Sequence, residues 1–271
     1  MSFVQDWHGL TKYFRERIAS RELGPGDKLP TEANMVETFG LSRYAVRRSL
    51  ATLAAEGLII RIPGNGPGRG TIVRESPKKV VRSSTRHQLE KSLVLSPQAI
   101  RSSLGQTEIN QDIPVGKTKF HAEYRTIKAN EDLAERLLVE EPDYVLQRTF
   151  TTSEKSSGHL LAFSVSYLPL ALVERNPELL DAGKEPWPGG TQHQLHTVGI
   201  EVATVIDEVD ARLMSDAERH DWGIQTGAPP LLYVVRCTLI GSDGRVVETS
   251  DAHYPVDRTY LRFTTPLDPR Q

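Results

Sequence analysis

Residues 28–73 read KLPTEANMVETFGLSRYAVRRSLATLAAEGLIIRIPGNGPGRGTIV, and their pattern predicts the fold of the first part of the chain. Thr31 is a good helix N-cap, apolar residues follow it at helical spacing, and Gly40 ends the helix. Ser42 then caps a second helix that carries three outward arginines near its start. Two short helices joined by a tight glycine turn predict a helix-turn-helix.

The residues after the second helix predict a wing. Residues 58–73 read as two short strands around a glycine-rich tip. Gly66, Gly68 and Gly70 permit a tight tip that approaches a DNA minor groove, and Arg69 is the cation of that tip. Two alternatives stay open at this point. The glycines serve only the turn, or the whole segment is a generic three-helix bundle with a hairpin.

The arginines of the second helix suit DNA recognition. Arg43 and Arg47 are four residues apart and share one helix face, with Arg48 beside them. An arginine in the major groove can donate two hydrogen bonds to guanine, whereas others neutralise phosphates. The sequence does not allocate these two roles among the three side chains.

The charge distribution agrees with a DNA-binding front. The 271 residues have a formal net charge of −2. Residues 1–91 hold 16 Lys and Arg against 9 Asp and Glu, whereas the remaining 180 residues hold 17 against 26. A basic segment that binds a polyanion, followed by an acidic segment that stays off it, is the pattern that this asymmetry indicates.

Residues 28–73 resemble the winged helix-turn-helix of the GntR family of bacterial repressors. The matching motifs are the LP(S/T)E opening, GLSR…VRR(A/S)L, the L…EGLI exit and the G.GT.V wing. Two positions depart from the family: Ala33 replaces a common DNA-contacting arginine, and Tyr44 stands where relatives often carry Thr. The residues expected to contact DNA are Thr31, Ser42, Arg43, Tyr44, Arg47, Arg48, Gly66, Gly68, Arg69 and Gly70.

The chain then changes character twice, so we expect a domain over 1–75, a linker over 76–95 and a second domain over 96–271. The linker prediction rests on the basic, Ser-rich composition of SPKKVVRSSTRHQLEKSLVL, whose cations are solvated or touch phosphates. Beyond residue 96, strands alternate with short helices and a Ser-Asp-Gly hairpin turn occurs at 242–244. These patterns predict an α+β domain with a mostly antiparallel sheet.

This second part resembles the effector-binding UTRA domain of the HutC subfamily of GntR regulators, which is similar in fold to chorismate lyase. The resemblance rests on SVSYLP at 164–169, LHTVGIEV at 195–202 and the long motif at 226–258, and it spans roughly residues 96–265. It implies a chorismate-lyase-like antiparallel sheet that binds a small molecule and pairs two chains.

A cleft over the sheet is the expected effector site. Strand alternation puts Glu248 and Tyr254 on one face of their strand, and Ser164 and Ser166 on one face of theirs. Arg148 lies in the middle of another strand, and the resemblance implies that such positions line the effector pocket. The alternative is that Arg148 and Glu248 form only a structural ion pair.

Other chemistry finds no support in the sequence, so we expect no cofactor, no metal and no catalytic site. A single cysteine, Cys237, excludes an intrachain disulfide and a zinc site built on cysteines, and its apolar strand predicts a packed core residue. His193 and His196 have metal-ligand spacing but no evident third ligand. The absence of long apolar runs predicts a soluble, cytoplasmic chain without a membrane partner.

The sequence thus predicts a homodimeric transcriptional repressor, with operator DNA and a small polar or anionic effector as partners. Two alternatives remain. One is a repressor without an effector, such as the control protein of a mobile element, and the other is a lyase-like enzyme tethered to DNA.

Overall fold

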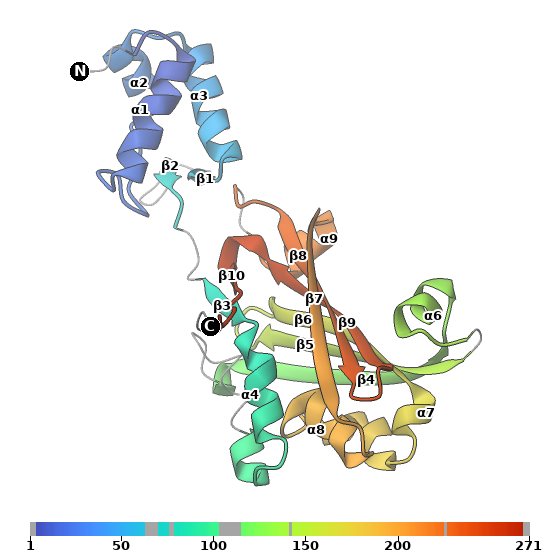
Figure 1. Cartoon of the computed structure of the whole chain (residues 1–271). Helices are drawn as coiled ribbons and strands as arrows, with labels where there is room; N and C mark the ends of the chain where they lie inside the picture. Colours follow the sequence, from blue (N-terminus) through green and yellow to red (C-terminus); the bar gives the residue numbers. More distant parts are fainter. Residues whose placement is uncertain are drawn as a thin grey trace. The chain divides into compact units, whose positions relative to one another are not determined.

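The structure is a computed structural model that describes residues 4–62, 70–75, 79–102, 115–140, 143–224 and 227–267. It divides into two compact units (Figure 1). The first holds the described residues up to 75 together with 224 and 227–230, and the second holds the others. Each unit has its own apolar core.

The first unit contains three helices and a two-stranded antiparallel sheet. Its elements are α1 (Trp7–Ala19), α2 (Glu32–Phe39), α3 (Arg43–Ala55), β1 (Ile59–Ile62) and β2 (Gly70–Val73). The apolar faces of the three helices meet in one core, in which Leu10, Met35 and Leu53 are fully buried. The predicted helix-turn-helix and the two strands of its wing are therefore confirmed.

The turn between α2 and α3 depends on Gly40. This residue has φ 66° and ψ 20°, in the left-handed region, and its N–H donates to the carbonyl of Val36. A residue with a Cβ pays a steric cost in this region, whereas glycine does not. The position therefore sets the direction in which α3 leaves α2.

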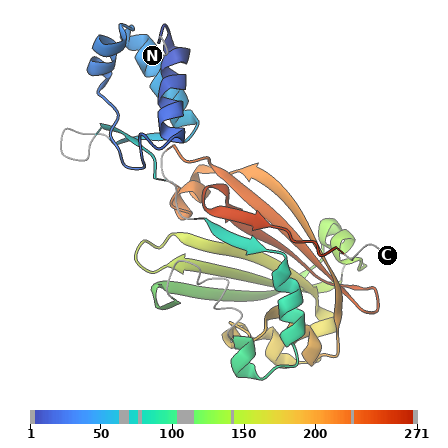
Figure 2. The same ribbon diagram turned by 60° about the vertical axis from the view of Figure 1, so that its left-hand side comes forward.

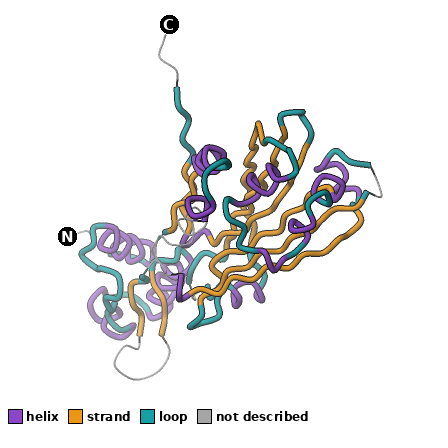
Figure 3. The backbone as a smooth tube through the Cα atoms, turned by 90° about the horizontal axis from the view of Figure 1, so that it is seen from below, coloured by secondary structure: helices purple, strands orange, loops and turns teal. Residues whose placement is uncertain are grey.

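The second unit is built on a six-stranded antiparallel sheet with strand order β4-β5-β6-β9-β8-β7. The long strands fan out side by side in Figure 3. Their bounds are β4 Thr118–Lys128, β5 Tyr144–Glu154, β6 Leu160–Pro169, β7 Val202–Leu213, β8 Leu231–Gly241 and β9 Val246–Pro255. The predicted α+β class and antiparallel sheet are confirmed.

Helices lie on both faces of this sheet. On one face lie α4 (Thr85–Leu93), α8 (Gly190–Thr197) and the short α7 (Leu170–Val173), as Figures 1 and 2 show. On the other lies α6 (Glu131–Leu137), whose Arg136 donates to Thr249 and Asp251 of β9. The remaining short elements are η1 Val115–Lys117, η2 Pro177–Leu180, η3 Ala182–Lys184, α9 Asp216–Asp221 and η4 Val256–Arg258.

Part of the predicted linker is wrong. Residues 80–83 form β3 (Val80–Ser83), which pairs in parallel with β10 (Thr259–Arg262), and α4 follows directly. The partner strand lies far along the chain, so local composition carried no sign of the pairing. The other domain boundaries stay predictions.

The helical segment over residues 170–180 is not one continuous helix. It is divided into α7 and η2, because Pro177 interrupts the helical hydrogen bonding between them. The sequence interpretation did not include α9, which begins with a capping box formed by Ser215 and Glu218.

Replacing Gly40 provides a test of the turn. We expect Gly40→Ala to lower the free energy of unfolding by about 1–2 kcal/mol, because alanine disfavours the left-handed conformation. Gly40→Asn should cost less, since asparagine tolerates this region. Chemical denaturation monitored by circular dichroism measures both. Equal stability of Gly40→Ala and the unmodified protein would contradict the assigned turn geometry.

Candidate functional site

A side-chain hydroxyl caps the N-terminus of each helix of the helix-turn-helix. The side chain of Thr31 accepts a hydrogen bond from the Asn34 N–H, and that of Ser42 accepts one from the Ala45 N–H, both at 3.2 Å. Each cap satisfies a backbone N–H that a helix start otherwise leaves without a partner. Both hydroxyls thus fix the ends of α2 and α3 at the surface where DNA contact was predicted.

The three arginines of α3 are all exposed, as predicted, but their surroundings differ. The Arg48 guanidinium lies 4.0 Å from the centre of the Trp7 ring on α1, within cation–π range. The Nε of Arg47 donates to Glu32 at 2.9 Å. No hydrogen bond or ion pair of Arg43 occurs within the part of the chain that the structure describes. Arg43 therefore projects into solvent.

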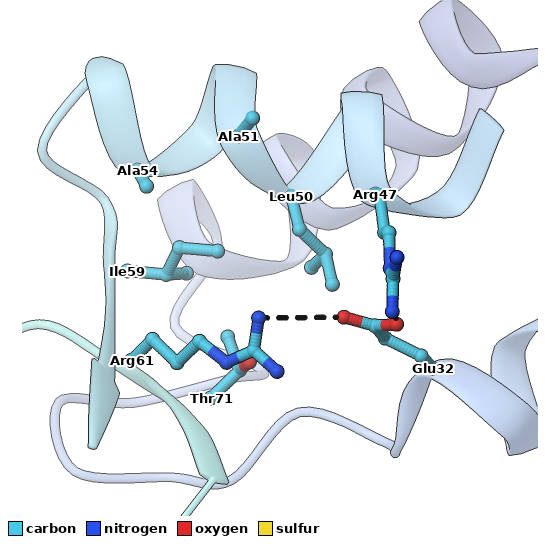
Figure 4. Close-up of a pocket in the computed structure, with 8 residues that line it drawn as sticks. All are labelled: Glu32, Arg47, Leu50, Ala51, Ala54, Ile59, Arg61 and Thr71. Carbon is cyan, nitrogen blue, oxygen red and sulfur yellow. Dashed lines mark hydrogen bonds and ion pairs between the residues drawn. The ribbon is translucent and has the colours of Figure 1, made fainter. Parts of the chain in front are cut away.

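Glu32 connects three elements of this unit. One carboxylate oxygen accepts from Arg47 of α3, and the other lies 3.6 Å from Nη1 of Arg61 on β1. In Figure 4, Arg47 reaches Glu32 from the helix above it, and Arg61 reaches it from the left. They border a surface hollow of about 440 Å³ whose other lining residues are Leu50, Ala51, Ala54, Ile59 and Thr71. The sequence interpretation did not assign this role to Glu32 or Arg61, although Glu32 is the acid of the LP(S/T)E motif.

The remaining predicted DNA contacts fall into two groups. Tyr44 is 72% exposed on α3, and Ala33, one of the two positions that depart from the family motif, is exposed on α2. Gly70 opens β2 with φ 118°. The other three wing predictions, Gly66, Gly68 and Arg69, lie outside the described residues.

Arg148 occupies the centre of the second unit and is only 2% exposed. Its Nε donates to Ser166 at 2.8 Å, and Nη2 donates to Glu248 at 2.7 Å. From α8, Gln194 accepts from Nη1 at 2.5 Å and Thr191 accepts from Nη2 at 3.0 Å. The guanidinium therefore joins three strands and one helix.

The network extends beyond Arg148. The Gln194 side-chain amide donates to Glu185 at 2.9 Å, and the Tyr124 hydroxyl donates to the same carboxylate. Burial raises the pKa of Tyr124 far above its ordinary value; Arg148 opposes the shift and the Glu185 carboxylate adds to it. Tyr124 consequently stays a neutral donor. Sequence reasoning missed these partners because they lie on elements far apart in the chain.

Strand register places six side chains in one row across the face of the sheet that α4 and α8 cover. Directly opposite residues in antiparallel strands point to the same face. The row runs through Tyr124, Arg148, Ser166, Ser250, Cys237 and Asp207. Its polar members mark this face as the part of the unit that is suited to a polar ligand.

The structure brings together three of the five predicted effector residues, namely Arg148, Ser166 and Glu248. Ser164 lies on the same face, in the next row, opposite Phe150. Tyr254 lies further along β9, where its ring faces the Arg82 guanidinium at 4.6 Å. The predicted set is therefore divided between two places on one face.

Two hollows open beside this network, between α4 and β7. One of about 390 Å³ includes His87, Gln192 and Asp207 in its lining, and one of about 240 Å³ includes His196 and Gln192. None of the five predicted effector residues lines either hollow. A ligand in this region would contact α4, an element that was expected to be linker.

The two other residue types considered from the sequence have identifiable environments. Cys237 of β8 is buried in the apolar core, as predicted. Burial raises the pKa of its thiol, and the negative charges of Asp207 and Glu248 raise it further. His193 accepts at Nδ1 from the indole N–H of Trp187 at 2.8 Å. That hydrogen bond gives the His193 side chain a partner within the chain.

Comparison with known proteins agrees with this geometry. The model for bacterial regulatory proteins of the gntR family matches residues 10–68, and the UTRA domain model matches residues 118–260, which is more than half of the chain. The chain is a GntR-family regulator with a UTRA domain. This regulator therefore has the two domains that its sequence motifs predicted.

Its relatives are regulators of transcription. The repressor NagR of Bacillus subtilis is 25% identical over 95% of this chain and 93% of its own length. The histidine utilization repressor of Klebsiella aerogenes is 30% identical over 40% of this chain and 46% of its own. A crystal structure of a GntR-family transcriptional regulator has a TM-score of 0.70, 25% identity, and coverage of 97% and 98%. The family consists of regulators and not of enzymes.

Within the described residues, no helix of this regulator is both long and apolar enough to cross a membrane.

The Arg148–Glu248 pair supplies a prediction about stability. We expect Arg148→Met to lower the free energy of unfolding by about 3–5 kcal/mol, because it leaves the buried Glu248 carboxylate without its cation. In Arg148→Met/Glu248→Gln the carboxylate is gone, so much of that loss should be recovered. Urea unfolding of Arg148→Met, Glu248→Gln and the double variant measures the coupling. Strictly additive losses would contradict a buried ion pair.

Proposed function

We propose that this regulator is a homodimeric repressor whose operator binding is controlled by a small polar or anionic effector in the UTRA domain. The observation that carries the DNA-binding part is the exposed set Arg43, Arg47 and Arg48 on α3 of a helix-turn-helix with the family's sequence motifs. Repression, as opposed to activation, is supported by NagR, a repressor by name that resembles this chain over nearly its full length.

The environments of the three arginines suggest which of them contact bases and which contacts phosphate. Arg43 and Arg47 lie one helical turn apart, and Arg47 is held in one orientation by Glu32. We assign these two to base edges, where an ordered guanidinium can make two hydrogen bonds to guanine. Arg48 is turned toward Trp7 of α1, and we assign it to a backbone phosphate.

Effector control is supported by the polar face of the second unit. A buried guanidinium, a serine hydroxyl and a carboxylate lie on that face, and Thr191 of α8 adds a second hydroxyl. Hollows of about 390 and 240 Å³ open beside α8. Pockets of this kind hold small ligands through a few fixed polar groups. The alternative of a lyase-like enzyme has less support, because the Glu248 carboxylate, an acid that such an enzyme could use, is already paired with Arg148.

Self-association is supported by the outer strand of the sheet. β7 is an edge strand, and it leaves Ile206, Val209 and Leu213 exposed. An edge strand that exposes apolar side chains is a natural surface for a second chain. A dimer would present two copies of α3 to two operator half-sites.

Arg47→Ala tests the base-reading assignment. We expect its affinity for the DNA upstream of its own gene to fall by about 1–3 kcal/mol, roughly 5- to 150-fold, relative to a scrambled duplex. Arg245→Ala, a solvent-exposed arginine in the β8–β9 turn, is the matched control and should leave both affinities unchanged. Fluorescence anisotropy at fixed salt measures them. An equal fall on both duplexes would mean that Arg47 contacts only phosphate.

Glu32→Gln tests the role of the carboxylate beside Arg47. Removing this negative charge should raise affinity for scrambled duplex and steepen its salt dependence by up to about 0.9 in the logarithmic slope, the value for one added phosphate contact. The ratio of the affinity for the upstream DNA to the affinity for scrambled duplex should fall, because Arg47 loses the ion pair that orients it. Glu37→Gln, on the same helix and exposed, is the control. An unchanged salt slope in Glu32→Gln would contradict this role.

Effector control can be tested by thermal shift. A panel of sugar phosphates, carboxylic acids and amino acids should contain compounds that raise the melting temperature of the full chain and change its operator affinity. Ser166→Ala, which removes an Arg148 partner, should reduce that shift, whereas Ser157→Ala in the exposed β5–β6 turn should not. Tight operator binding with no thermal shift from any compound would favour the effector-independent repressor.

A further inference from the structure

His87, Asp207 and Cys237 meet where α4 packs against the sheet. One potential ligand atom from each residue lies within 4.8 Å of the other two. The imidazole Nε2 of His87 lies 2.9 Å from Oδ2 of Asp207, and Asp207 is directly opposite Cys237 in the β7–β8 register. We propose that these three side chains bind a divalent transition metal ion of the zinc class. The proposal goes beyond DNA binding and effector control and depends on neither.

The three donors suit such an ion chemically. Imidazole nitrogen, thiolate sulfur and carboxylate oxygen are the ligands that Zn²⁺ and Co²⁺ take in tetrahedral protein sites. Bonds of about 2.0–2.3 Å in a tetrahedron put the donors roughly 3.3–3.8 Å apart. The cluster therefore needs only small side-chain movements, and Cys237 releases its thiol proton to solvent when the metal–sulfur bond forms.

A second observation concerns the carboxylate itself. Oδ1 of Asp207 is buried, and no hydrogen-bond partner for it occurs among the residues that the structure describes. A buried carboxylate oxygen without a partner is costly, because it has lost water and gained nothing in exchange. A metal ion between the three side chains supplies that missing interaction.

The site also has an entry path and room for a fourth ligand. The hollow of about 390 Å³ is lined by both His87 and Asp207, so a metal-bound water has space there. Lys91, which also lines that hollow, is directed to the Val202 carbonyl at 2.8 Å and to Glu201 at 3.1 Å. The charge of Arg86 acts on both Asp207 and Cys237 and would be offset by their negative charges. A bound ion would fasten α4 to β7 and β8.

The sequence alone did not predict this cluster. His87 and Asp207 are 120 residues apart, and both lie outside any metal-binding motif. Cys237 was interpreted as a core residue, which describes its burial but not its neighbours.

Cobalt titration of the tag-free, reduced full chain tests the site. Cys237 is the only cysteine, so any thiolate-to-Co²⁺ charge-transfer absorption must come from it. We expect one Co²⁺ per chain, with a charge-transfer band, intense tetrahedral d–d bands, and loss of both on addition of Zn²⁺. A folded chain without the charge-transfer band would overturn the proposal.

Variants separate this site from other metal binding. Cys237→Ser should abolish the charge-transfer band, and His87→Gln and Asp207→Asn should each weaken Co²⁺ binding by at least about ten-fold, as expected for lost ligands. His193→Gln is the matched histidine control and should bind like the unmodified chain. Circular dichroism confirms that each variant is folded. A band that persists at full affinity in both His87→Gln and Asp207→Asn would also overturn the proposal.

Discussion

The second domain depends on one buried positive charge. Transferring a guanidinium from water to a protein interior is strongly unfavourable unless opposite charge and hydrogen bonds compensate it. Arg148 of β5 obtains this compensation from Ser166 on the neighbouring strand β6, from Glu248 on the next strand β9, and from two side chains of α8. The requirement fixes the sheet register locally and holds α8 against the sheet. A ligand that changed any of these contacts would act directly on that arrangement.

In the first domain, a carboxylate connects several elements, as the Arg148 guanidinium does in the second. Glu32 lies between Arg47 of α3 and Arg61 of β1, and thereby joins the helix-turn-helix to the base of the wing. Because these side chains are partly exposed, the pair adds little to stability. Its effect is on orientation, since an arginine that is already ordered loses less conformational entropy on binding DNA. Under the proposed function, the same carboxylate would repel phosphate and so favour base contacts of Arg47 over backbone contacts.

Local sequence signals predicted the local structure. The caps Thr31 and Ser42, the left-handed Gly40 and the alternating strands all follow from interactions within a few residues. The exposure of Arg43, Arg47 and Arg48 followed from helical periodicity in the same way.

Contacts between distant parts of the chain were predicted much less well. The pairing of β3 with β10, the hydrogen bonds from Arg148 to α8 and the approach of His87 to Asp207 each join distant segments. Composition showed that residues 76–95 are basic and Ser-rich, but not that they have a partner strand. Alternation correctly placed Ser164 and Tyr254 on the face of Arg148, yet it could not show how far along the strands they lie from it.

The proposed function requires that two copies of this chain recognise a symmetric operator through α3. A DNase I footprint of the full chain on the DNA upstream of its own gene tests this requirement. We expect two protected half-sites related by two-fold symmetry, with centres about one helical turn or a multiple of it apart. A single asymmetric protected segment, or uniform protection that follows salt concentration alone, would contradict it.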